Sequence, residues 1–240
     1  MKTTLIKAST RGHANHGWLN TYHTFSFADY YDPMRVNFGA LRVINDDTVT
    51  GGEGFGTHPH NNMEIVSIPL NGSLEHKDST GGHGVIKPGD IQVMSAGTGV
   101  RHSEMNGHQE DPVSFFQIWV FTAKKDVEPR YQQASFDFFS EENKNKLIEI
   151  VGPGPRNNGL WIYQDAWFNT GIFDKGKSID YKIKKKEHGL YAMVIEGEFT
   201  VAGQKLDRRD GIGVWDTDSV EITSNSTDGR ILLIEVPMEV

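Results

Sequence analysis

The sequence predicts an all-β fold built from two similar β-domains in tandem. Short runs rich in Val, Ile, Phe and Tyr recur along the chain, and turn-forming pairs such as Asn71-Gly72 and Pro88-Gly89 separate them. Strands with turn signals about every 8–12 residues are typical of sandwiches and barrels. No alternation of strand and helix patterns is visible, which argues against α/β folds.

Six segments carry the strand pattern most clearly, and one segment resembles a helix. The strand-like segments are residues 38–44, 63–70, 90–94, 113–122, 190–195 and 231–236. The helix candidate is 138–147, because Ser140-Glu141-Glu142 is typical of a helix start. A polar stretch and a Gly-Pro cluster at 152–159 surround this helix, so we expect a linker over residues 126–159.

A faint internal repeat supports the tandem arrangement. Gly72-Ser-Leu-Glu leads to Asp90, and Gly197-Glu-Phe-Thr leads to Asp210, each as strand, turn, strand, Asp turn and strand. The spacings differ, so the repeat is weak, but two similar β-domains would explain it.

Composition excludes several classes of function. The 240 residues include 24 Lys and Arg against 32 Asp and Glu, a formal net charge of -8, which argues against a dedicated nucleic-acid-binding protein. The chain has no cysteine, so disulfides, thiolate metal sites and thiol nucleophiles are excluded. It has neither a run of about 20 apolar residues nor a signal-peptide pattern, so we expect a cytoplasmic protein.

The histidines are unevenly distributed, since nine of the ten lie within residues 1–108. Alternate residues of a strand point to the same face. His58 and His60 would therefore present two imidazoles side by side, and His102 and Glu104 would present an imidazole and a carboxylate. The first pair alone is a weak signal. If the two strands face each other, the four groups could hold divalent Fe, Mn, Ni, Cu or Zn.

These segments resemble the two cupin motifs. The first motif, Gly-x5-His-x-His-x3-Glu-x6-Gly, is matched at Gly52, His58, His60, Glu64 and Gly72, with the last gap one residue longer than usual. The end of the second motif, Gly-x2-His-x3-Asn, is matched at Gly99, His102 and Asn106, with Gly97 in place of the usual proline.

Longer strings are similar to the pirin family, particularly to bacterial members described as quercetin 2,3-dioxygenases. They are THPHNNMEIV at 57–66, MSAGTGVRHSE at 94–104, and the opening from Arg11-Gly to Thr24-Phe-Ser-Phe. The resemblance implies a bicupin of two jelly-roll barrels with few short helices. Residues 1–125 would form the metal-binding barrel, 126–159 a linker with a short helix, and 160–240 a degenerate barrel without metal ligands.

The resemblance also implies the site. His58, His60, His102 and Glu104 would hold one divalent metal, iron in the first place, with Mn, Ni, Co, Cu or Zn as alternatives. Glu64 matches the ligand glutamate of ordinary cupins, and we expect it to orient an imidazole rather than to bind the metal. His188 lies beside a lysine run and is expected to be solvated, so no second metal site is predicted.

The implied reaction is the cleavage of a flavonol such as quercetin by O2 with release of carbon monoxide. The substrate 3-oxygen would coordinate the metal, and Glu104 would accept its proton. No nicotinamide, flavin or phosphate-binding motif is present. Aromatic and apolar residues flank the motif strands and could line the pocket, although core packing is the commoner role: they are Phe55, Met63, Phe116 and Trp119.

Other histidines lack partners at ligand spacing and are expected on the surface or in the core: His13, His16, His23, His76, His83 and His108. Arg101 should face away from His102. A second hypothesis remains open, in which the chain is a non-enzymatic, metal-binding regulator that acts through protein partners. A third is that quercetin stands in for another enol. None of these involves nucleic acid or a membrane.

Overall fold

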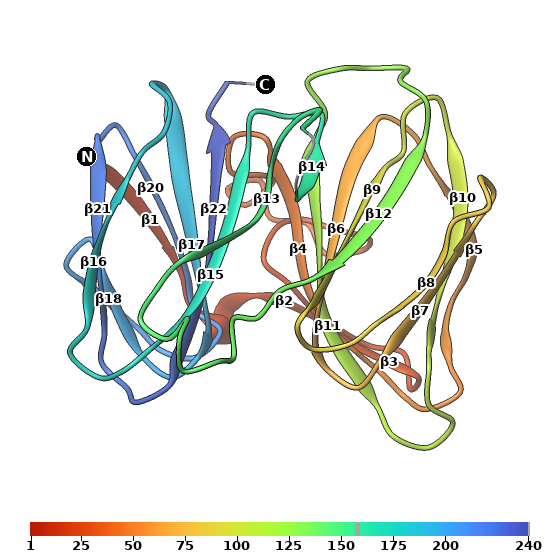
Figure 1. Cartoon of the computed structure of the whole chain (residues 1–240), viewed down its shortest axis with the longest axis horizontal. Helices are drawn as coiled ribbons and strands as arrows, with labels where there is room; N and C mark the ends of the chain where they lie inside the picture. The colour runs from red at the N-terminus through yellow and green to blue at the C-terminus, as the bar shows by residue number, and fades with distance from the viewer. Residues whose placement is uncertain (157–158, 240) are drawn as a thin grey trace.

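Strands make up almost all regular structure in residues 1–156 and 159–239, which the computed structural model describes. They form two barrels that lie side by side (Figure 1). Each barrel combines one seven-stranded sheet with one four-stranded sheet. The only helical segment in these residues is a 3-10 turn, η1 (Ala8–Thr10). The predicted fold class, two tandem cupin-type barrels, is therefore confirmed.

The barrel that carries the histidine motifs has its large sheet in the order β12-β9-β6-β11-β4-β3-β2 and its small sheet in the order β5-β10-β7-β8. We call it the N-terminal barrel. Its strands are β2 (Gly12–Asn15), β3 (Leu19–His23), β4 (Leu41–Val49), β5 (Gly54–His60), β6 (Met63–Asn71), β7 (Leu74–Asp78), β8 (His83–Ile86), β9 (Asp90–Ser95), β10 (Val100–Asn106), β11 (Val113–Phe121) and β12 (Arg130–Ser135).

The C-terminal barrel repeats this plan. Its large sheet has the order β1-β20-β17-β22-β15-β13-β14 and its small sheet the order β16-β21-β18-β19. Its strands are β1 (Lys2–Ile6), β13 (Ile148–Pro153), β14 (Leu160–Ile162), β15 (Trp167–Phe173), β16 (Ser178–Lys182), β17 (His188–Glu196), β18 (Phe199–Val201), β19 (Gln204–Leu206), β20 (Gly211–Trp215), β21 (Ser219–Ser224) and β22 (Gly229–Pro237).

The domain boundaries differ from those predicted. β1 pairs with β20, so the first residues of the chain belong to the C-terminal barrel. The predicted linker holds β12, which pairs with β9 in the N-terminal barrel, and β13, which pairs with β15 in the other. β1 and β12 occupy equivalent edge positions, so each barrel is completed by a strand that lies outside its predicted boundaries. Part of the predicted Gly-Pro cluster, residues 157 and 158, lies outside the described residues.

The short helix predicted at 138–147 does not form, and a series of turns takes its place. Asn143 donates its side-chain amide to the Asp137 carbonyl at 2.5 Å. Asn145 has a φ of 64° and donates its backbone N–H to the carbonyl of Ile172. Such local asparagine hydrogen bonds compete with the helix ladder, and a left-handed residue ends it.

The internal repeat corresponds to equivalent strands. Gly72 links β6 to β7, Gly197 links β17 to β18, and both have positive φ, 74° and 80°. The strands that begin at or just after Asp90 and Asp210 then return beside the first strand of each unit, β9 on β6 and β20 on β17. The sequence signal therefore reports a structural repeat.

The apolar core explains why the two barrels stay together. Its largest cluster joins Ile68 and Phe116 of the N-terminal barrel to Phe168, Met193 and Ile234 of the other, all buried. The two large sheets thus pack face to face, which leaves the small sheets on the outside (Figure 1). β17 is buried over eight consecutive residues because one face meets this interface and the other meets its own barrel interior.

Candidate metal centre

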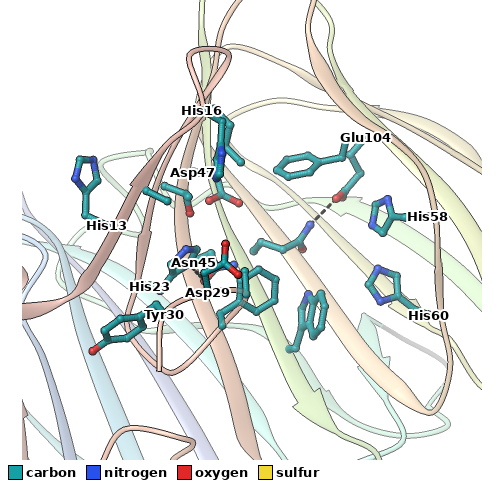
Figure 2. A pocket seen from close by; sticks show the side chains of 18 residues that line it. His13, His16, His23, Asp29, Tyr30, Asn45, Asp47, His58, His60 and Glu104 are labelled. Atoms are coloured by element: carbon teal, nitrogen blue, oxygen red, sulfur yellow. Dashed lines mark hydrogen bonds between the residues drawn. The ribbon is translucent and has the colours of Figure 1, made fainter. Parts of the chain in front are cut away.

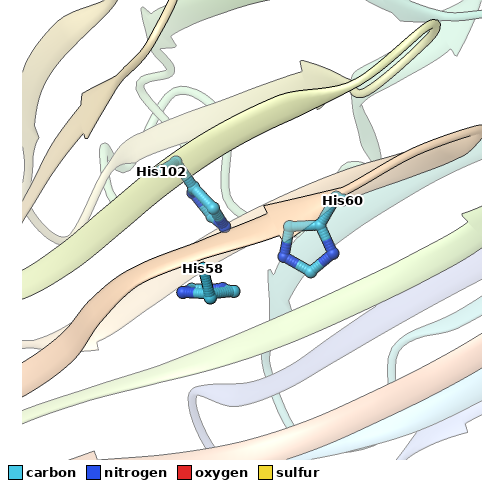
Figure 3. A group of neighbouring side chains, drawn as sticks. All are labelled: His58, His60 and His102. Carbon is cyan, nitrogen blue, oxygen red and sulfur yellow. The ribbon is translucent and has the colours of Figure 1, made fainter.

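Strands β5 and β10 bring three histidines together. His58 lies opposite His102 in the antiparallel register, and His60 shares the face of His58. The ring centroids of His58 and His102 are 4.4 Å apart, and each lies 4.9 Å from that of His60. One nitrogen from each ring lies within 4.8 Å of the others. Figure 3 shows the three rings converging from the two strands.

The protonation of these rings suits metal binding. His58 Nδ1 lies 2.8 Å from the Gly56 carbonyl, so this nitrogen donates and Nε2 keeps its lone pair. Burial and the charge of His58 lower the pKa of His60 to about 4. Burial, with the neighbouring histidines, lowers the pKa of His102 to about 2. The imidazoles of His60 and His102 are therefore neutral at neutral pH, as metal ligands must be.

One buried nitrogen without a hydrogen-bond partner in the described part of the chain, His102 Nε2, shows whether a metal would fit between the three rings. His102 Nε2 is buried and has no hydrogen-bond partner among the described residues. Leaving such an atom unpaired costs free energy, and a cation between the three rings would pair it. Three neutral imidazoles are a donor set that divalent transition metals accept. The residues therefore fit the metal that the sequence predicts.

A buried chain of hydrogen bonds contacts His102 at Nδ1, the ring nitrogen that does not face His58 and His60. His102 Nδ1 lies 3.4 Å from His76 Nδ1, and His76 Nε2 lies 2.8 Å from a carboxylate oxygen of Asp78. Asp78 can only accept, so His76 donates through Nε2 and accepts at Nδ1, and His102 donates through Nδ1. This tautomer directs the His102 Nε2 lone pair toward His58 and His60. Hydrogen bonds that end on a carboxylate commonly fix the tautomer and orientation of a metal-binding histidine in this way.

Glu104 lies beside His102 but is held by other side chains. One of its oxygens accepts hydrogen bonds from Ser67 and Gln92, each at 3.2 Å, and the other accepts one from Gln117. Its carboxylate groups within 4.8 Å with His76 and His102, and not with His58 and His60. The β5–β10 pairing shifts register between His102 and Glu104. The three histidines thus converge as predicted, and the fourth ligand stays a prediction.

Burial makes Glu104 an unusual acid. Its side chain is 1% exposed, and desolvation raises the pKa of Glu104 to about 7 despite the three hydrogen bonds, which lower it. The group can therefore hold or release a proton near neutral pH. Such tuning is common where a carboxyl moves protons.

Glu64 does not belong to this site. It lies in the large sheet, as the second residue of β6, and Ser95 donates to its Oε2 at 2.6 Å. Neither group of potential metal ligands among the described residues includes it. The prediction that Glu64 orients an imidazole is therefore wrong, because β6 carries it away from the β5–β10 pair.

A cavity of about 550 Å³ opens beside the histidines, as Figure 2 shows. Phe55 and Trp119 line it, as the sequence suggested, whereas Phe116 packs in the interface core and Met63 packs against Ile65 and Met94. Its remaining lining comes from β2, β3, β4 and the loops between them, from β5 and β10, and from β11: His13, Ala14, His16, Leu19, Thr21, His23, Phe27, Ala28, Asp29, Tyr30, Asn45, Asp47, His58, His60, Glu104 and Gln117.

Sequence reasoning missed several polar residues here. His76 was grouped with unpartnered histidines, yet it is fully buried against His102 and stacks on Tyr131 at 4.4 Å. The spacing of His76 and Asp78, which share a strand face, was the available signal. His188 was expected to be solvated, but it is 6% exposed and lies 3.2 Å from the buried Glu235. Arg101 is exposed, as expected.

The fold and site define a class of protein, the two-barrel cupins with a candidate histidine metal site in one barrel. The chain belongs to the pirin family. The family model described as Pirin matches residues 6–120, and the one described as Quercetinase C-terminal cupin domain matches residues 149–236.

Among the residues that the structure describes, no helix is both long and apolar enough to cross a membrane.

Relatives match over nearly the whole chain. The chain is 41% identical over 233 residues to a quercetin 2,3-dioxygenase of Escherichia coli strain K12, covering 97% of this chain and 98% of that protein. It is 36% identical to a pirin-like protein of Caulobacter vibrioides, covering 93% and 95%. The crystal structure of the bacterial pirin YhhW from Escherichia coli in complex with nickel(II) matches with a TM-score of 0.92 and 39% identity over all of both chains.

Proposed function

We propose that the protein is a metal-dependent dioxygenase that cleaves flavonols such as quercetin with O2 and releases carbon monoxide. The observation that carries the proposal is the position of the three histidines, whose free nitrogens converge beside a cavity of about 550 Å³. That volume is ordinary for a site that binds a small organic molecule. The name of the 41% identical relative supports the same reaction.

In this proposal the protein residues divide into three roles. His58, His60 and His102 hold a divalent metal, with Glu104 as the fourth ligand. A bound metal would act as a Lewis acid toward the enol oxygen of the substrate. Glu104 accepts the proton of the enol hydroxyl, a task that suits a carboxyl whose pKa is raised to about 7. Ser67, Gln92 and Gln117 hold its carboxylate in place.

The cavity favours the enzyme over a purely regulatory protein. A regulator that acts through its surface needs no internal space beside the metal, whereas a substrate does. The lining combines the aromatic side chains Phe27, Phe55 and Trp119 with a few polar groups, which is typical of a site for a planar organic molecule. Iron as the native metal and the cytoplasm as the location stay predictions. Another enol as the physiological substrate stays an alternative prediction.

The test is oxygen-dependent loss of quercetin by purified protein reconstituted separately with Fe, Mn, Ni, Co and Cu. We expect turnover with at least one metal, release of carbon monoxide, and no turnover under anaerobic conditions. His58→Ala should abolish it, and His83→Ala, which changes an exposed histidine on β8 at the opposite edge of the same small sheet, should not. Absence of turnover with all five metals would overturn the proposal in favour of the regulator or another substrate.

A further inference from the structure

The cavity has a second polar side that the proposed reaction does not use. Asp47, Asn45 and His23 lie across from His58 and His60 in Figure 2. The first two come from β4 in the large sheet, whereas the metal-side histidines come from β5 in the small sheet. His23 Nδ1 and Asn45 Oδ1 satisfy each other at 2.8 Å. Two buried groups on this side remain without a hydrogen-bond partner among the described residues, Asp47 Oδ1 and the hydroxyl of Thr21, which lies opposite Asp47 in the β3–β4 register. Of the two, Asp47 is the carboxylate and so the stronger acceptor for a ligand.

Asp47 differs from the other buried carboxylates. It is 3% exposed, and its Oδ1 is the one buried carboxylate oxygen in the described residues without a hydrogen-bond partner. The others each accept hydrogen bonds, and they are Glu64, Asp90, Glu104, Asp210 and Glu235. Burial, helped by the charges of Asp46 and Glu104 and opposed by the Thr21 hydroxyl, raises the pKa of Asp47 to about 7.

The preceding residue shows what the fold does with a carboxylate that has only a structural role. Asp46 points to the opposite face of β4, where Arg209 Nε lies 3.0 Å and Arg11 Nη2 3.3 Å from its Oδ2. Asp47 faces the cavity and receives no such cation. A buried acceptor that is left unpaired destabilises the protein, so a donor from a bound molecule would supply the hydrogen bond that the fold does not make.

We propose that Asp47 is a specificity-determining residue, which accepts a hydrogen bond from a hydroxyl on the end of the substrate remote from its reacting enol. This inference rests on the proposed function and names its substrate class more narrowly, as enols on an aromatic scaffold that carries further phenolic hydroxyls. The aromatic walls fit such a scaffold, because Phe27 packs edge-on against Trp119 with ring centroids 5.3 Å apart. A phenol is a strong donor toward a carboxylate in a water-poor site.

The experiment compares two flavonols under anaerobic conditions, so that binding is measured without turnover. Quercetin carries hydroxyls on its outer rings, and 3-hydroxyflavone has the same enol without them. Dissociation constants are measured by calorimetry for the metal-loaded wild type, for Asp47→Leu, which removes the acceptor and keeps the same branching at Cγ, and for Asp47→Asn, which keeps one acceptor oxygen. Asp47→Val replaces the leucine variant if that protein does not fold.

We expect the wild type to bind quercetin at least about tenfold more tightly than 3-hydroxyflavone, a ratio typical of one buried hydrogen bond. Asp47→Leu should remove most of this preference while changing 3-hydroxyflavone affinity less than about threefold, and Asp47→Asn should keep part of it. Equal affinities in the wild type, or an equal loss for both ligands in Asp47→Leu, would overturn the inference. If the wild type preferred quercetin but showed no oxygen-dependent turnover, the role of Asp47 would stand and the proposed dioxygenase activity would be overturned. If the wild type bound neither flavonol, both the role of Asp47 and the dioxygenase activity would be overturned.

Discussion

The two barrels share one topology but use their interiors differently. The small sheet of the N-terminal barrel has the order β5-β10-β7-β8, and that of the C-terminal barrel has the equivalent order β16-β21-β18-β19. Where β5 and β10 carry His58 and His102, β21 carries Val220 and Ile222, which pack into a continuous apolar core. The same strand order thus supports either a filled core or a chemical site, and the inward-facing residues decide which.

The difference has an energetic side. The C-terminal barrel buries Leu190, Val214 and Leu233 in one cluster, which stabilises the chain by the hydrophobic effect. The N-terminal barrel instead buries polar groups such as His76 and Glu104, which contribute only where they are hydrogen-bonded. The largest apolar cluster contains residues of both barrels, so its burial stabilises the two barrels together.

The largest expected effect tests where the metal is held. His102→Ala removes the one histidine whose Nε2 is buried without a partner, so metal affinity should fall by at least about 100-fold, beyond the loss typical of outer-shell changes. Metal content after dialysis and oxygen-dependent quercetin loss measure this. His83→Ala, an exposed histidine of the same small sheet, is the matched control. Retention of one metal per chain by His102→Ala would contradict the centre.

The second prediction compares matched truncations in the two barrels. Leu233→Ala in the filled barrel should lower the free energy of unfolding by about 2–5 kcal/mol, because it leaves a cavity among fully buried neighbours. Leu19→Ala should cost less, since Leu19 already lines the cavity of the N-terminal barrel. Denaturant unfolding of the metal-free proteins gives both values. Equal losses would show that the N-terminal interior is packed as tightly as the other.

A third prediction uses the titration of Asp47. Its pKa is raised from 3.8 to about 7, so the folded state holds this proton more tightly than the unfolded state. The stability of the wild type therefore falls as pH rises from about 4 to 7, by at most about 4 kcal/mol for this group. Asp47→Asn cannot ionise and escapes this loss.

The gain of Asp47→Asn over the wild type should consequently be small at pH 4 and greatest above pH 7. Urea unfolding of the metal-free proteins at several pH values measures it, and metal-free protein avoids competition between protons and metal at the histidines. Asp46→Asn is the contrasting variant, because Asp46 is ion-paired with Arg11 and Arg209 and its loss should destabilise. A gain of Asp47→Asn that did not depend on pH would show that burial does not shift this carboxyl.

Sequence reasoning predicted the fold class and the clustered histidines because both rest on local patterns. Alternation along a strand places His58 and His60 on one face, and turn glycines mark the strand ends. Neither signal needs knowledge of distant parts of the chain. The resemblance to cupin motifs then supplied the pairing of β5 with β10, which the local pattern left open.

The misses share a different cause, because each depends on contacts between segments far apart in sequence. β1 joins the C-terminal barrel through pairing with β20, where Ile6 lies opposite Gly211, which comes 205 residues later in the chain (211 minus 6). His188 looks solvated beside its lysines, yet the fold places it against Glu235. Asp47 reads as one of two adjacent acids, and only the structure shows that Asp46 alone has cations. Tertiary context overrides composition at each of these positions.

The smallest expected effect is a difference in metal affinity between substitutions in two buried histidine–carboxylate pairs, one in each barrel. His76 with Asp78 continues to His102, whereas His188 lies beside Glu235, which accepts hydrogen bonds from Tyr181 and from backbone N–H groups. Only the first pair should affect the metal. His76→Phe keeps a ring to stack on Tyr131 but removes both nitrogens, so metal affinity should fall by about 10–100-fold.

Competition with a chelator of known affinity measures this change in the folded variants. Tyr131→Phe, which removes a hydroxyl and keeps the stacked ring, should alter metal affinity less than His76→Phe does. His188→Phe should leave metal affinity unchanged even if it lowers stability, because the described contacts of Glu235 lead away from the N-terminal barrel. If His76→Phe bound metal as tightly as the wild type, His76 would not be needed to fix the tautomer of His102. The His76–Asp78 pair would then have only a structural role, like the His188–Glu235 pair.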